Sequence, residues 1–109
     1  MSEREGGIVF ERMLSRIREK VRTQQYVVTI HADEEMDDDL LLWSDVEHAL
    51  LTGKIIERQK DRDTNEWKYV IFGKTGEGRR IGVVTKLSPS GKVVILTVYD
   101  AEKELSNGV

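Results

Sequence analysis

Two histidines are the side chains of this sequence best suited to proton transfer near neutral pH, because histidine changes its charge between about pH 5 and 8. His31 directly follows a short apolar run, at a point where a strand would pass into a helix and a site could open. His48 lies among the apolar positions of a predicted helix, which favours a surface or structural role. His31 is therefore the candidate catalytic residue for proton transfer, and capping or packing against the next helix is its alternative role.

Four cationic side chains between residues 74 and 86 are candidates for contacting phosphate: Lys74, Arg79, Arg80 and Lys86. Arginine suits this role because its planar fork can donate two parallel hydrogen bonds. Neighbouring residues of a strand point to opposite faces, so Arg80 shares a face with Lys86 and not with Arg79. Arg80 and Lys86 are the catalytic candidates for stabilising phosphate charge, with a purely solvated pair as the alternative. Lys74 and Arg79 are the candidates for binding nucleic acid.

Tyr99, near the end of the last predicted strand, is the remaining catalytic candidate. Its ring could stack on a base and its hydroxyl could donate a proton. The alternative is a half-buried strand tyrosine whose hydroxyl is satisfied within the fold.

No motif of the sequence indicates a metal ion or a cofactor. The acidic run over residues 33–39 lacks the sixth-position glycine of a calcium-binding loop, since no glycine occurs between Gly7 and Gly53. The absence of cysteine excludes cysteine-zinc sites. Residues 74–78 are glycine-rich, but their lysine precedes the glycines and a strand follows, so we expect a hairpin turn there instead of a phosphate-binding Walker loop.

The composition predicts one small globular domain. With 109 residues and 39% hydrophobic side chains, the chain can form a single core. We expect a flexible N-terminus over residues 1–9, an α+β domain over residues 10–100 and a flexible tail over residues 101–109. No stretch resembles a secretion signal or a membrane span, so the sequence predicts a cytoplasmic protein without membrane contact.

Apolar periodicity and capping residues predict the helical part. A helix is expected from Phe10 to Gln25, a short strand over residues 26–30, and one or two helical turns over residues 31–39 with Thr29 or Asp33 as N-cap. Ser44 and Glu47 have the spacing of a capping box that would start a helix ending at Thr52. Gly53 would close it in a left-handed conformation.

After residue 53 the pattern becomes extended. Strands are expected over residues 54–60, 67–73, 79–88 and 92–99, and the short turns between them favour antiparallel hairpins. The predicted fold is therefore α+β, with N-terminal helices packed on a four- to five-stranded, mainly antiparallel sheet.

The charges are unevenly distributed. Residues 1–53 hold 6 Lys or Arg against 12 Asp or Glu, whereas residues 54–92 hold 10 against 5. This asymmetry is typical of an anion-binding sheet beside an acidic helical layer, and charges that merely cover a solvated surface are the alternative.

Five short motifs carry a resemblance to a known family: Thr29-Ile30-His31-Ala32, Asp45-Val46-Glu47, Gly53-Lys54-Ile55-Ile56-Glu57, Tyr69-Val70 and Thr97-Val98-Tyr99. Together they resemble the domain of unknown function 4258 family, over roughly residues 26–99. One position departs from the pattern, because the family usually has an arginine where this chain has Asp39-Leu40.

The resemblance implies a RelE-like fold, related to the BrnT and MqsR toxins, which are small ribonuclease toxins of bacterial toxin-antitoxin pairs. It thus implies a metal-independent endoribonuclease acting on mRNA, and a small antitoxin protein and RNA as partners. On such a fold, the residues from Lys74 to Lys86 would present cations to the scissile phosphate. A non-catalytic protein-binding or oligomerising domain on the same fold, for example a homodimer, is the alternative, so enzymatic activity is left open.

Overall fold

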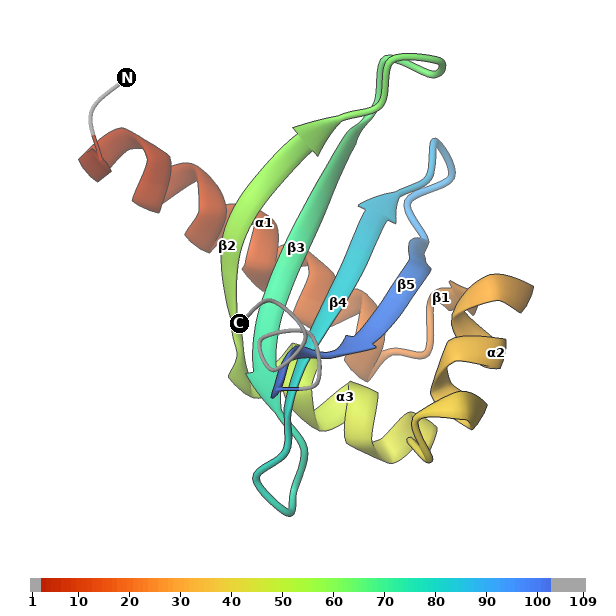
Figure 1. Ribbon diagram of the computed structural model, residues 1–109. Coiled ribbons are helices and arrows are strands. Elements are labelled where there is room, and N and C mark those ends of the chain that lie inside the picture. Colours follow the sequence, from red (N-terminus) through yellow and green to blue (C-terminus); the bar gives the residue numbers. More distant parts are fainter. Residues whose placement is uncertain (1–2, 103–109) are drawn as a thin grey trace.

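The computed structural model describes the backbone of residues 3–102 and the side chains of residues 10–102. The helices are α1 (Glu3–Arg22), α2 (Ile30–Asp38) and α3 (Trp43–Thr52), and the strands are β1 (Tyr26–Val28), β2 (Lys54–Lys60), β3 (Trp67–Lys74), β4 (Arg80–Leu87) and β5 (Val93–Asp100). The α+β class is confirmed (Figure 1). The division into residues 1–9, 10–100 and 101–109 stays a prediction, and residues 103–109 of the tail lie outside the described part.

The five strands form one mixed sheet in the order β1-β5-β4-β3-β2. The strands from β2 to β5 pair in sequence as antiparallel neighbours, as predicted. The expectation of a mainly antiparallel sheet is nevertheless wrong, because β1 pairs with β5 in parallel, with Tyr26 opposite Val93. The chain leaves β1 at one edge of the sheet, crosses through α2 and α3 to β2 at the other edge, and returns strand by strand until β5 lies beside β1.

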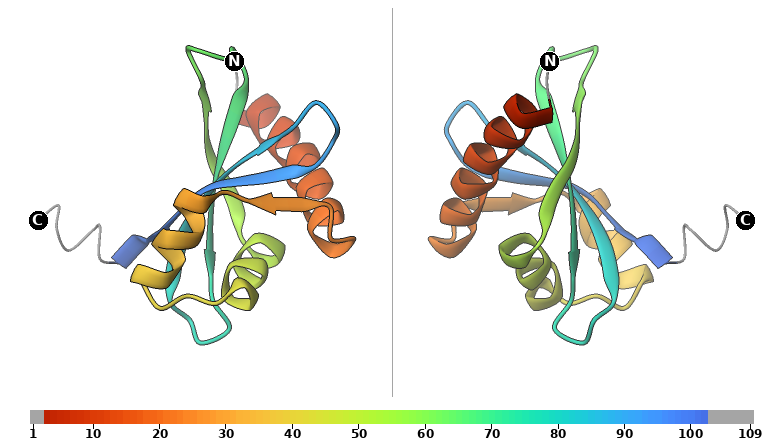
Figure 2. Two further views of the ribbon diagram at one scale, coloured as in Figure 1. Left: turned by 90° about the vertical axis from the view of Figure 1, so that its right-hand side faces the viewer. Right: turned by 90° about the vertical axis from the view of Figure 1, so that its left-hand side faces the viewer.

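Helices α1 and α3 cover one face of the sheet, and α2 lies beside β5 (Figure 2). The core lies under α1 and α3, where Ile17 and Leu50 pack with Ile71, Val83 and other inward residues of the strands. No helix of the described chain covers the opposite face, which is called the open face below. It is formed by alternate strand residues: Val70, Phe72, Lys74, Arg80, Gly82, Val84, Lys86, Thr97 and Tyr99.

Helix α1 begins seven residues before the predicted start, at Glu3 instead of Phe10. The prediction followed apolar periodicity, which starts at Phe10, whereas helical hydrogen bonds can extend beyond the residues that pack. At the other end Gln24 takes a positive φ of 60°, and the N–H of Gln25 donates to Lys20 O at 2.8 Å. The helix therefore ends at Arg22 in a left-handed cap.

The starts of α2 and α3 differ in how well they were predicted. Thr29 is the N-cap of α2, since its Oγ1 accepts the N–H of Ala32 at 3.1 Å. The predicted cap at Ser44 is wrong, because α3 starts at Trp43 and Leu42 occupies the N-cap position, two residues before Ser44. Asp45 takes the place that Glu47 was expected to fill, and its Oδ2 accepts the N–H of Leu42 at 2.9 Å.

Gly53 ends α3, although not for the predicted reason. Its φ of −83° is open to any residue, so no left-handed conformation is required. The requirement is space, because a Cβ at Gly53 would collide with the carbonyl oxygens of Phe72 and Ala49. A Cβ at Gly73 would likewise collide with the backbone of Ala49. The two glycines thus let the end of α3 approach β3 backbone to backbone.

Candidate functional site

His31 lies at the start of α2, beside the edge of β5. Its side chain is exposed, and its Nε2 lies 3.3 Å from Oε1 of Glu35, one helical turn further on. The same Glu35 oxygen accepts the N–H of Val98 at 3.1 Å. Helix α2 therefore covers the part of β5 that the three-residue strand β1 leaves unpaired. Because six of the seven residues 33–39 are acidic, phosphate would approach His31 against negative charge.

Arg80 and Lys86 lie on the open face at opposite ends of β4. A strand rises by about 3.3 Å per residue, which puts their Cα atoms roughly 20 Å apart. Arg80 Nε donates to Glu102 at 3.2 Å, and Lys86 Nζ lies 3.5 Å from Oε2 of Glu66. The structure therefore does not bring Arg80, Lys86 and His31 together around one phosphate.

Arg79 points away from the open face. Its Nη2 donates to Oδ2 of Asp100 at 2.9 Å and to the carbonyl of Asp39 at 2.9 Å. The hydrogen bond that Arg79 donates to Asp100, together with the negative charges of Asp100 and Asp39, raises the pKa of Arg79. This geometry favours a structural role for Arg79, which holds the loop between α2 and α3 against the end of β5.

Tyr99 and Phe72 form an aromatic pair on the open face. Their ring centroids are 6.1 Å apart with an edge-to-face angle of 66°. The tyrosine ring crosses Gly82 on the strand between them, where a Cβ would collide with it. Phe72 remains 37% exposed near the end of β3. The open face therefore combines an accessible aromatic side chain with the cationic ends of β3 and β4.

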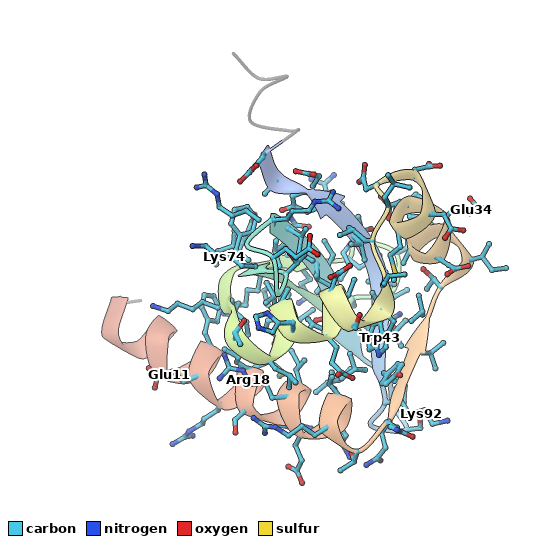
Figure 3. All side chains as sticks on the ribbon, turned by 90° about the horizontal axis from the view of Figure 1, so that it is seen from below. Glu11, Arg18, Glu34, Trp43, Lys74 and Lys92 are labelled. Atoms are coloured by element: carbon cyan, nitrogen blue, oxygen red, sulfur yellow. The ribbon has the colours of Figure 1, made fainter. Side chains whose placement is uncertain are left out.

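Lys74 lies at the end of β3, close to α3 (Figure 3). Its backbone carbonyl is 2.8 Å from Nδ1 of His48 on α3. These two residues and Lys54 line an open cavity of about 630 Å³, which extends from the end of α3 to Phe72 on the open face. The cavity is called the hollow below. Sequence reasoning assigned His48 a structural role, and no local signal could have placed it beside a lysine 26 residues away.

Nothing in the described part of the chain points to a metal site. Across residues 10–102 no group of three or more His, Asp or Glu side chains is positioned to hold an ion. The helices described there also include none that is long and apolar enough to cross a membrane.

Comparison with known proteins gives one match. Residues 28–100 match the family model of a domain of unknown function, DUF4258. The matched range runs from the end of β1 through β5, so it contains the hollow and the complete open face. No curated protein and no solved structure matches the chain.

Proposed function

Because the chain belongs to the DUF4258 family, we propose that it is a toxin-like component of a bacterial toxin-antitoxin module and that it binds single-stranded RNA on the open face. The resemblance to small ribonuclease toxins supports the biological class. The structural support is the exposed Phe72 on the inner strand β3, which Tyr99 contacts edge to face.

An exposed aromatic ring on an inner strand is suited to unpaired bases. Every base has a flat apolar face that can stack on such a ring, and each stacked base contributes about 1–3 kcal/mol by alanine substitution. The cations around the ring add attraction for the phosphates. Lys74 and Arg80 pair across β3 and β4 at one end of the open face, and Lys86 lies at the other end.

Cleavage of the bound RNA is the activity that the resemblance implies. It requires a proton acceptor at the ribose 2′-hydroxyl and a cation at the phosphate. His31, Arg80, Lys86 and Tyr99 are the residues we propose for these steps. In the described structure they are separated, since Arg80 and Lys86 lie at opposite ends of β4 and His31 lies on α2, so the four residues cannot all contact one phosphate in this arrangement.

A non-catalytic protein-binding domain is the second candidate. It is favoured by the ion pairs, since Arg80 and Lys86 each already face a carboxylate. A surface whose cations are neutralised in this way attracts RNA less strongly and suits a protein partner such as a small antitoxin or a second copy of the chain.

RNA binding by matched aromatic variants tests the proposal. Phe72→Ala removes the exposed ring of the open face, whereas Trp67→Ala removes a ring of similar exposure, 39%, on the opposite side of the same strand. Fluorescence anisotropy with a short labelled single-stranded RNA should show affinity falling about 5- to 150-fold for Phe72→Ala. Trp67→Ala should bind like the parent. Equal affinities for the two variants, or no RNA binding by the parent, would leave the protein-binding domain as the better reading.

A further inference from the structure

Two lysines that line the hollow lie apart from the carboxylates of the described residues. Lys68 and Lys86 both face carboxylates, at 3.8 Å and 3.5 Å. Lys54 and Lys74 are exposed and line the hollow, and across residues 10–102 neither ammonium group has a carboxylate within ion-pair distance. Two lysines that line one cavity without a paired carboxylate produce a positive potential there, which attracts anions.

His48 adds a third group to the hollow, with a defined tautomer. A carbonyl oxygen can only accept, so Nδ1 of His48 donates its hydrogen to the Lys74 carbonyl at 2.8 Å. In the neutral ring, Nε2 then carries the lone pair. In the protonated ring, Nε2 becomes a second N–H donor and the ring carries a positive charge.

The end of α3 does not repel an anion, although the carboxyl end of a helix normally carries partial negative charge. Arg18 of α1 donates to two of the terminal carbonyls, those of Leu50 at 3.4 Å and Gly53 at 2.6 Å. Thr52 donates its hydroxyl to the carbonyl of His48 at 2.7 Å. The carbonyls of Leu50, Gly53 and His48 at this helix end therefore already have donors within the fold.

We propose that the hollow binds a phosphate group of the RNA strand whose base stacks on Phe72. The inference rests on the proposed function and adds the place where the backbone is held. Phe72 forms part of the wall of the hollow, so a nucleotide can place its base on the ring and its phosphate between Lys54 and Lys74. His48 donates from Nε2 when its ring is protonated.

Two phosphate sources share this chemistry, an internal phosphodiester and a terminal 5′-phosphate. The probes are dimethyl phosphate, which imitates the diester, and a pair of otherwise identical RNA oligonucleotides with a 5′-phosphate or a 5′-hydroxyl. Dimethyl phosphate should shift the NMR signals of His48, Lys54 and Lys74. Equal RNA affinities assign the hollow to the diester, and tighter binding of the phosphorylated RNA assigns it to the terminal group.

Charge-matched variants provide the decisive comparison. Lys74→Ala and Lys92→Ala each remove one exposed positive charge, but Lys92 lies in the turn between β4 and β5, well away from the hollow (Figure 3). A plot of log affinity against log salt concentration has a negative slope. Removing one phosphate contact should make this slope less steep by about 0.7 for single-stranded RNA. We expect this loss for Lys54→Ala and Lys74→Ala, and an unchanged slope for Lys92→Ala.

A substitution tests the part played by His48. The charged groups lining the hollow with it are Lys54 and Lys74, whereas Glu77 of the same loop is not part of the lining. His48→Ala removes the ring that could donate to a bound phosphate, so binding of dimethyl phosphate should weaken. Binding as tight as that of the parent would exclude His48 from the site.

The outcomes separate the two proposals. If the parent binds RNA but Lys74→Ala behaves like Lys92→Ala, the hollow is not the phosphate site and the proposed function stands. If the parent binds no RNA while dimethyl phosphate still shifts the three signals, the proposed function is wrong. The hollow then binds phosphate, but the phosphate does not belong to an RNA strand.

Discussion

One oxygen of Glu35 lies between the Val98 N–H, at 3.1 Å, and Nε2 of His31, at 3.3 Å. Glu35 therefore accepts a hydrogen bond from the backbone at the edge of the sheet, in addition to its contact with the candidate catalytic histidine. The backbone bond is partly buried, whereas His31 is 67% exposed at its side chain. Loss of the bond to the Val98 N–H should therefore reduce the stability of the protein more than loss of the contact with His31.

We expect Glu35→Ala to lower the free energy of unfolding by about 1–3 kcal/mol, because it leaves the Val98 N–H without an acceptor under α2. His31→Ala should cost less than about 1 kcal/mol, since exposed ion pairs contribute little. Urea denaturation of both variants measures the difference. A larger loss for His31→Ala would show that the histidine, and not the edge bond, holds α2 in place.

A second prediction compares two helix starts. Thr29→Ala should destabilise the protein by about 0.5–2 kcal/mol, because Oγ1 of Thr29 caps the N–H of Ala32. Ser44→Ala should change the stability by less than about 0.5 kcal/mol, since Ser44 lies inside the first turn of α3. Thermal melts of the two variants give the comparison. Equal losses would contradict the assignment of Leu42 as the N-cap.

A third prediction concerns the close approach of α3 to β3. Gly73→Ala should be among the most destabilising single substitutions in the chain, on the order of 3 kcal/mol or more, because its Cβ would overlap the Ala49 backbone. Gly76→Ala is the matched control, since open space surrounds that position. It should be neutral, or stabilising by up to about 1 kcal/mol. Expression yield and unfolding midpoints would reveal both effects, and a well-folded Gly73→Ala would refute the backbone contact.

The fourth prediction addresses activity. Overexpression in a bacterium should slow growth, and His31→Ala or Arg80→Ala should relieve the effect. Loss of proton transfer by His31 should cost about 10²- to 10⁴-fold in cleavage rate, and loss of charge stabilisation by Arg80 on the order of 10² or more. RNA extracted from the induced cells would show the cleavage directly. Variants must melt near the parent temperature, and a harmless parent that leaves RNA intact would exclude the enzyme.

The local parts of the fold were predictable because their signals are local. The hydroxyl of Thr29 precedes a helical pattern and caps it, and the turn-rich segments after residue 60 join antiparallel strands. The prediction of an N-cap at Ser44 failed because it also relied on a local signal alone. Its spacing to Glu47 satisfies the capping pattern, but the carboxylate of Asp45 accepts the Leu42 N–H, and the N-cap lies two residues earlier, at Leu42.

The site was less predictable because its determinants are distant in sequence. Alternation along β4 correctly places Arg80 and Lys86 on one face. It contains no information about Glu102 and Glu66, which come from outside the strand and pair with these cations. The contact between His48 and Lys74 likewise depends on how α3 crosses β3.

The parallel pairing of β1 with β5 has a consequence for the order of folding. Strand β1 has only three residues, its sheet partner is the last strand of the chain, and α2 depends on the same strand for its support. A growing chain cannot complete this edge until β5 has left the ribosome, whereas the hairpins from β2 to β4 can form earlier. The region around His31 should therefore be the last part to become structured during synthesis.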